Sequence, residues 1–323
     1  MAFGKFNNIV YVRTFATLMV VAYHSICMYT HRWDYNVDFI NTYEIIAEIL
    51  NRIDMPAFVF ISGFLFSDQI SKNRFKSSFE IILHKSKRLL IPYFFWMGIV
   101  IIFLPEQLTY DKVINGFSHL WFLPMLFQLF LLAIITIPLW TSLSKKISII
   151  CLISMFLFVF LSYYKGWKIP FLYIKTFFPF FYLGIITNRH KLLNINIKRD
   201  IKILIVLCAI YLIICTYFHS NNPAIRDLVI KILSCSIIYY IMYYIKDVPS
   251  PTNRFITLIN DNSMGIYLIH HIIIQSFLSW DIILMIFNNH HIIAPLFIFL
   301  FSLLSSILIS SRLSKIPYLH NII

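Results

Sequence analysis

An arginine and a histidine lie in the first apolar stretch of the chain, which runs from about residue 8 to 30 and has the length of a membrane span. Arg13 and His24 are both costly in lipid, and such residues inside a span are usually functional. On an α-helix, eleven residues advance about 16 Å and turn about 20° beyond three full turns. The sequence therefore predicts a guanidinium and an imidazole on one helical face, separated by about half of the ~30 Å hydrocarbon core. Such a pair favours a lined passage over a simple anchor.

Further polar side chains stand at the ends of later apolar stretches. His119 and Trp121 begin one stretch, and the spacing of Ser263, Tyr267 and His270 places these three close to one face of another helix. Trp121 also fits the aromatic belt that marks a membrane interface.

Zinc coordination by histidines is conceivable but is not favoured. His24, His119 and His270 come from separate stretches, and the adjacent His271 points in another direction, so at most one of the two neighbours is expected to face a cavity. The chain has no short ligand pair such as H-x-x-x-H, and its five cysteines lack metal-ligand spacing. We predict no metal site and read the cysteines as free packing residues.

A basic run, HKSKRLLIPYFFW, precedes the third apolar stretch. Clusters of this kind entering a membrane commonly determine topology. The same Lys85, Lys87 and Arg88 could instead hold the phosphates of a cytoplasmic cofactor, with Arg88 best suited to bidentate contact. The sequence leaves both interpretations open.

The second apolar stretch carries charges before the segment MPAFVFISGFLFS. Glu48 and Arg52 have the i,i+4 spacing of an intrahelical ion pair, which could simply neutralise itself at the interface. Asp54 precedes Met-Pro, and a proline inside a span is expected to kink the helix. Ser62 and Gly63 are small enough to permit close helix contact.

Composition indicates which elements position these residues. The chain is 59% hydrophobic and 13% charged, with a net charge of +13 and a mean hydropathy of +0.78. These values predict one α-helical integral membrane domain over residues 1–323, without nucleic-acid binding, since the basic residues cluster in loops between apolar stretches. The positive-inside rule places both termini in the cytoplasm, with Arg13 near the cytoplasmic end of its helix and His24 near the outer end. About ten spans are expected, over residues 8–30, 42–67, 89–104, 119–140, 147–164, 171–187, 201–219, 227–245, 259–279 and 291–311.

Six motifs in order resemble the acyltransferase-3 family of bacterial membrane proteins. They are the Arg13 and His24 pair, MPAFVFISGFL, the basic run ending in KRLLIPYF, HLWFL, FFYLGI and NSMGIYLIHH. The resemblance covers about 260 residues. The chain departs from the family at Asp54, where many relatives have histidine, and its basic run is rich in lysine where relatives often have arginine.

The resemblance implies a stand-alone membrane O-acyltransferase in the bacterial cytoplasmic membrane. It would transfer an acyl group, usually acetyl, from cytoplasmic acyl-CoA to a hydroxyl of a surface polysaccharide or its lipid-linked precursor. Arg13 and His24 correspond to the family's essential pair. His24 would act as a general base or carry the acyl group itself, while Arg13, Lys85, Lys87 and Arg88 would bind the cofactor. His119, Trp121, Ser263, Tyr267 and His270 are candidates for the oxyanion or the acceptor.

A polytopic transporter or flippase of a glycan precursor is the alternative. Such proteins also carry polar groups within spans, but they commonly show inverted repeats or paired broken helices, and the sequence has no evident repeat. The sequence does not indicate the acceptor, the acyl group or the oligomeric state.

Overall fold

Residues 7–103, 109–167, 172–194, 201–217, 223–249, 251–317 and 322 are described by a computed structural model, in which the regular elements are all helical. The predicted span ends at 104, 171 and 218–219 lie outside these residues. The first half contains α1 (Asn7–Ile26), η1 (Cys27–Tyr29), α2 (Asn41–Asn51), α3 (Asp54–Ser71), α4 (Ser78–Phe103), α5 (Tyr110–Asn115), η2 (Ser118–Trp121), α6 (Phe122–Ile135), α7 (Ile137–Ser142) and α8 (Lys145–Tyr164). The second half contains α9 (Leu172–Arg189), η3 (Leu192–Asn194), α10 (Ile201–Tyr217), α11 (Pro223–Tyr244), α12 (Arg254–Asp261), α13 (Ser263–Leu278), α14 (Asp281–Asn289) and α15 (Ile293–Leu313).

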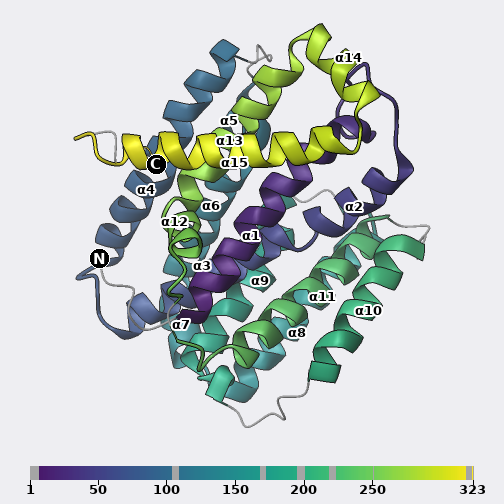
Figure 1. Ribbon diagram of the computed structural model, residues 1–323. Coiled ribbons are helices and arrows are strands. Elements are labelled where there is room, and N and C mark those ends of the chain that lie inside the picture. The colour runs from purple at the N-terminus through teal and green to yellow at the C-terminus, as the bar shows by residue number, and fades with distance from the viewer. Residues whose placement is uncertain are drawn as a thin grey trace.

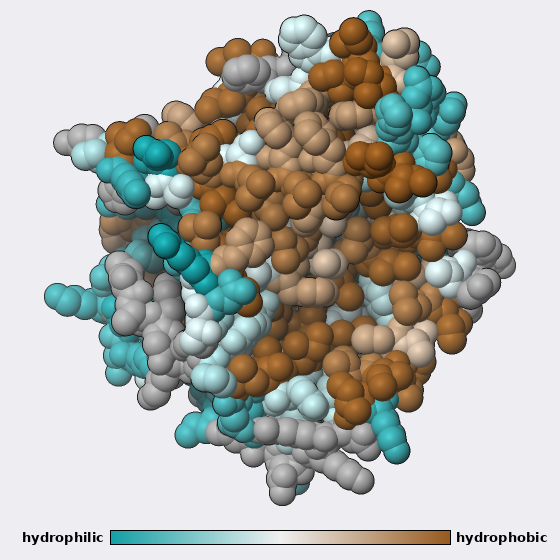
Figure 2. Space-filling view, viewed as in Figure 1, coloured by the Kyte–Doolittle hydropathy of each residue, from teal (hydrophilic) through white to brown (hydrophobic). Residues whose placement is uncertain are grey.

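The chain is a multi-pass helical membrane protein. Among the described residues, five helical segments are long and apolar enough to cross a membrane, or six if the pair α13 and α14, bent by 91°, forms one span. Apolar side chains lie on the outside of these helices, as Ile153 on α8 and Leu296 on α15 illustrate, with 61% and 60% of their surface exposed. Figure 2 shows this apolar surface across the face that α15 covers. The ten spans and the cytoplasmic termini stay predictions.

Several expected spans are divided into two helices. The second is broken at Arg52 and Ile53, so that Asp54 and Pro56 lie in the first turn of α3. Proline is tolerated there because the first amides of a helix have no intrahelical acceptor. The expected kink inside the helix is therefore wrong: Pro56 lies at the start of a new helix.

The centre of the molecule is the contact between α3 and α9. Gly63 and Gly184 allow the two backbones to touch, since a Cβ added to Gly63 would lie 2.0 Å from the carbonyl oxygen of Phe181, and one added to Gly184 would lie 2.1 Å from that of Phe60. Close approach through small residues is a common packing mode between membrane helices. The close contact predicted for Gly63 is confirmed.

Helix α1 runs through the middle of the fold, beside α12, α13 and α3 (Figure 1). Helix α15 crosses in front of α13 in this view and also contacts α1. A core of buried apolar side chains joins α1, α3, α4, α6 and α9. This packing fixes α1 against α12 near one end and against α13 near the other.

Candidate active site

Four imidazole rings meet where α1, η2 and α13 come together. Nδ1 of His24 lies 3.1 Å from Nε2 of His270. The His271 ring stacks on the His119 ring at 4.2 Å and meets the His24 ring edge-on at 5.2 Å. His119, His270 and His271 are buried, whereas His24 is half-exposed. We name these four residues the histidine cluster, of which His24 is the most exposed member.

The turn before η2 explains how His119 enters the histidine cluster. Gly116 has φ of 117°, and a Cβ there would lie 2.0 Å from Cα of Trp121, so this tight turn depends on glycine. Tyr267 donates its hydroxyl hydrogen to the carbonyl of His119. Nε2 of His119 in turn donates to the carbonyl of Leu268, 3.1 Å away. Two bonds to α13 thus hold His119 in place.

The hydrogen-bond acceptors determine the tautomers of the two closest rings. A carbonyl only accepts, so Nδ1 of His270, 2.7 Å from the carbonyl of Ile266, carries a hydrogen. Its Nε2 is then an acceptor in the neutral ring. Nδ1 of His24 also carries a hydrogen, which it shares between the carbonyl of Val20 at 2.9 Å and Nε2 of His270. The lone pair of neutral His24 therefore lies on Nε2, the nitrogen available to take a proton from a substrate.

The sequence-predicted residues are distributed unevenly around this cluster. His24, His119, Tyr267 and His270 come together, although Tyr267 uses its hydroxyl hydrogen on the backbone. Trp121 stacks on Tyr173 of α9 instead, with ring centres 4.8 Å apart. Ser263 begins α13, two helical turns or about 10 Å along the axis from His270.

Sequence reasoning missed one member of the histidine cluster, His271, and one ring that contacts the cluster, Trp33. His271 takes part because the rings of His24 and His119 each contact both adjacent histidines of α13. Trp33 lies 5.9 Å from the His24 ring and 5.4 Å from the His271 ring, measured between centres. Trp33 follows the span, where a tryptophan signals an interface rather than a site. Among the described residues, no group of three histidine, cysteine or acidic side chains could hold a metal ion.

A second group of polar residues surrounds the other end of α1. Nη1 of Arg13 lies 3.4 Å from Oδ1 of Asn260 in α12, and Arg13 is within electrostatic range of Arg88 and Asp261. Arg88 also interacts with Lys85. We name Arg13, Lys85 and Arg88 the cationic cluster.

Members of the basic run differ in their surroundings. Lys85 is only 5% exposed: its Nζ lies 3.2 Å from Oε1 of Gln69 and 4.1 Å from the ring centre of Phe130. Arg88 and Lys87 are exposed. Arg74, from the loop before α4, interacts with both Lys85 and Arg88 and was not singled out from the sequence. The available signal was its place in the loop before α4, ten residues ahead of the basic run.

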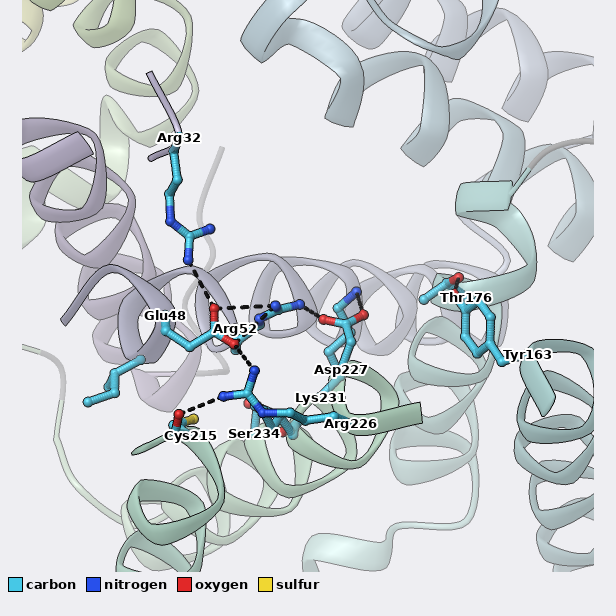
Figure 3. Close-up of polar contacts among 12 residues, drawn as sticks. Arg32, Glu48, Arg52, Tyr163, Thr176, Cys215, Arg226, Asp227, Lys231 and Ser234 are labelled. Atoms are coloured by element: carbon cyan, nitrogen blue, oxygen red, sulfur yellow. Dashed lines mark hydrogen bonds and ion pairs between the residues drawn. The ribbon is translucent and has the colours of Figure 1, made fainter. Parts of the chain in front are cut away.

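A network of charges lies beside η1 and joins α2 to α11 (Figure 3). The intrahelical pair of Glu48 and Arg52 is confirmed, at 3.1 Å. Glu48 also accepts from Arg32 at 2.9 Å and from Arg226 at 3.0 Å. Asp227 pairs with Arg52 and with Lys231, so the network extends along α11. Three arginines share one carboxylate, which is more than a self-neutralising pair.

Two further charges complete the surroundings of this network. Burial opposes the charge of Arg32, but Tyr23, Glu44 and Glu48 more than offset it, and the pKa of Arg32 is raised above its usual value. Asp54 is 1% exposed and accepts from the backbone amide of Met55 at 2.6 Å. Its carboxylate is within electrostatic range of Lys231.

A pocket of about 770 Å³ lies elsewhere, beyond the C-terminal ends of α3, α9 and α11. Several of its cations have local partners: Lys72 pairs with Asp68, Lys246 donates to the carbonyl of Leu193 at 3.0 Å, and Arg189 donates to the carbonyl of Thr141. Cations are favourable at helix C-termini, which accounts for them there. None of the sequence-predicted site residues lines this pocket, so its volume does not mark the chemistry.

The fold and these clusters define a polytopic membrane protein with a group of imidazoles near one end of α1 and a group of cations near the other. Comparison with family models identifies an acyltransferase domain, that of the acyltransferase-3 family, over residues 6–311. The chain belongs to this family and is a membrane acyltransferase. Comparison with curated proteins and with solved structures found no match.

Proposed function

We propose that this protein transfers an acetyl group from cytoplasmic acetyl-CoA to a hydroxyl of a surface polysaccharide or of its lipid-linked precursor. It does so in a bacterial cytoplasmic membrane, with both termini in the cytoplasm. The observation that carries the proposal is the arrangement along α1. The available Nε2 of His24 lies about 16 Å from Arg13 along one unbroken helix, with Arg13 in the cationic cluster.

His24 serves as the general base in the proposed reaction. The acceptor oxygen attacks the thioester carbon while Nε2 of His24 takes the hydroxyl proton. The carbon–sulfur bond then breaks, and the proton returns to the leaving thiolate, giving the ester and free CoA. His270 holds the ring of His24 in the tautomer that this step needs. A covalent acyl-histidine at the same nitrogen is the variant, in which acetyl passes to Nε2 before it reaches the hydroxyl.

The cationic cluster holds the phosphates of CoA in this proposal. Arg13 and Arg88 repel each other electrostatically, and an anionic phosphate placed between them relieves that repulsion. Guanidinium groups suit phosphate because they can donate two parallel hydrogen bonds. Bound there, the cofactor would extend its pantetheine arm along α1 and present the thioester near His24. A cytoplasmic donor could thereby serve an acceptor at the outer face without crossing the membrane.

The experiment uses the purified protein in proteoliposomes with labelled acetyl-CoA and surface glycan as acceptor. His24→Ala should lower kcat about 10²- to 10⁴-fold, the usual contribution of general acid–base catalysis. The matched control is His290→Ala, which removes an exposed histidine beyond α14. Full transfer by His24→Ala would contradict the catalytic role.

Arg13→Ala tests the cofactor site in the same preparation. It should raise KM for acetyl-CoA about tenfold or more, as expected for the loss of a charge-assisted contact. Arg254→Ala, at an exposed arginine that begins α12, is its control. An unchanged KM would refute the cofactor role. Movement of glycan across the bilayer without consumption of acetyl-CoA would favour the transporter instead.

A further inference from the structure

The segment between η1 and α2 encloses a small pocket directly beyond the end of α1. The pocket has a volume of about 270 Å³ and is lined by Met28, Tyr29, Thr30, His31, Trp33, Asp34, Tyr35, Val37 and Phe39. It falls just below the ~300–1,000 Å³ of pockets that hold drug-sized ligands, so it suits a single ring rather than a chain of residues.

This pocket is held in shape by contacts with distant parts of the chain. Tyr35 donates its hydroxyl hydrogen to the side-chain amide oxygen of Gln275 in α13. The backbone amide of Asp38 donates to Oδ1 of Asn288 in α14 at 2.8 Å. The hydroxyl of Tyr43 donates to the carbonyl of His291 at 2.7 Å. Two bonds to α13 and α14, and a third from the start of α2 to the turn after α14, preorganise the segment before any ligand arrives.

Trp33 connects this pocket to the histidine cluster. Its ring lines the pocket. The plane of the indole lies at 28° to the His24 ring, with ring centres 5.9 Å apart, and at 89° to the His271 ring, with ring centres 5.4 Å apart. The indole is half-exposed. His24 does not line the pocket itself, so a ring that rests on Trp33 would be linked to His24 through the indole.

The lining favours a neutral polyhydroxylated ring. Trp33, Tyr35 and Phe39 offer aromatic faces, on which the C–H face of a pyranose stacks, while Asp34 offers a carboxylate that accepts from hydroxyls. The described lining residues include neither lysine nor arginine, which a phosphate would need. The neighbouring Arg32 directs its guanidinium to Glu44 and Glu48 instead.

We propose that this pocket is the acceptor subsite, in which Trp33 carries one neutral sugar ring and Asp34 binds its hydroxyls beside His24. The assignment rests on the proposed function, because it takes the acceptor to be a glycan. Trp33 then sets the position of the sugar ring relative to His24, and so acts as a specificity-determining residue.

Direct binding of sugars tests the subsite independently of catalysis. Purified protein in nanodiscs, without acetyl-CoA, is titrated with a panel of methyl pyranosides, including hexosides, N-acetylhexosaminides and deoxyhexosides. Binding is measured by saturation-transfer NMR. At least one sugar should bind saturably, and Trp33→Ala should weaken its Kd about tenfold while Trp33→Phe stays within about threefold.

Two further variants separate recognition from misfolding. Asp34→Asn changes an exposed side chain and should weaken the Kd about threefold, whereas Trp280→Ala, at an exposed tryptophan that precedes α14 outside the pocket, should leave it unchanged. The subsite is refuted if no sugar in the panel binds. It is also refuted if Trp33→Ala and Asp34→Asn both bind as wild type does.

Transfer assays distinguish this proposal from the proposed function. The KM for the glycan should be about tenfold higher in Trp33→Ala than in the wild type, while the KM for acetyl-CoA is the same in both. Transfer with an unchanged KM for the glycan would overturn the subsite and leave the acyltransfer proposal standing. Sugar binding at Trp33 without any transfer from acetyl-CoA would overturn the acyltransfer proposal and leave the sugar-binding pocket standing.

Discussion

Gly63→Ala is expected to destabilise the whole helical core, because the new Cβ would lie 2.0 Å from the carbonyl oxygen of Phe181 in α9. Carbon and oxygen make contact at about 3.3–3.6 Å, so α3 and α9 must separate by more than about 1 Å. Gly184 lies at the same crossing, and a Cβ added to it would lie 2.1 Å from the carbonyl oxygen of Phe60. The contact is therefore reciprocal, and one helix cannot relax without moving the other.

The expected cost follows from the side chains at this crossing. Phe60 and Phe181 are fully buried, and a gap of 0.5–1 Å forfeits a quarter to a half of each atomic contact. Overpacking a core costs about 1–3 kcal/mol in most cases. Because backbone rather than a flexible side chain must move, we expect about 3 kcal/mol. At about 2–4 °C per kcal/mol, this lowers the Tm by roughly 6–12 °C.

Thermal unfolding in detergent, followed with a thiol-reactive dye, measures this shift. The five cysteines are free, and Cys27, Cys215 and Cys235 are buried, so unfolding exposes new thiols. The matched control is Gly98→Ala in α4, where an added Cβ meets nothing within 4 Å among the described residues. That variant should keep or slightly raise the Tm, since alanine is favoured over glycine in a helix by about 1 kcal/mol. Equal melting temperatures for the two variants would refute the reasoning.

Two other predictions follow from the charge network and the histidine cluster. Glu48→Ala should lower the Tm in the same dye assay by the equivalent of about 3 kcal/mol, because it leaves three arginines without their shared carboxylate. An unchanged Tm would contradict this prediction and show that the arginines reach other acceptors. His270→Ala should lower kcat about tenfold with KM for acetyl-CoA unchanged, because Nδ1 of His24 would keep only its bond to the Val20 carbonyl. Steady-state transfer kinetics measure this split, and a rise in that KM alone would contradict the positioning role.

The sequence was informative wherever spacing along one helix decides the outcome. Arg13 and His24 lie together on α1, and Glu48 pairs with Arg52, because helical periodicity relates residues within one segment. The close contact at Gly63 was also predictable from residue size. Hydropathy, which averages over a window, indicated the membrane class without any knowledge of the packing.

Contacts between distant segments could not be read from the sequence. Arg226 reaches Glu48 from 178 positions away, and Trp33 reaches His271 from a segment without regular structure. Pro56 indicated an interruption of this span, but the sequence placed it inside a helix, whereas the break falls at Arg52 and Ile53, just before α3. The tautomer of His24 depends on Val20, which is local, and equally on His270, which is not.

The arginine end and the histidine end of the candidate site are joined by one continuous helix on one side and by two separate helices on the other. On one side, Arg13 and His24 share α1, whose uninterrupted backbone hydrogen bonds fix their separation. On the other side, their partners Asn260 and His270 lie on α12 and α13, which are interrupted at Asn262. A cofactor arm that spans the site therefore lies between the continuous helix α1 and the interrupted pair α12 and α13. Adjustment to the cofactor or the acceptor would fall on the junction of α12 and α13, while α1 keeps the donor and acceptor ends at a constant distance.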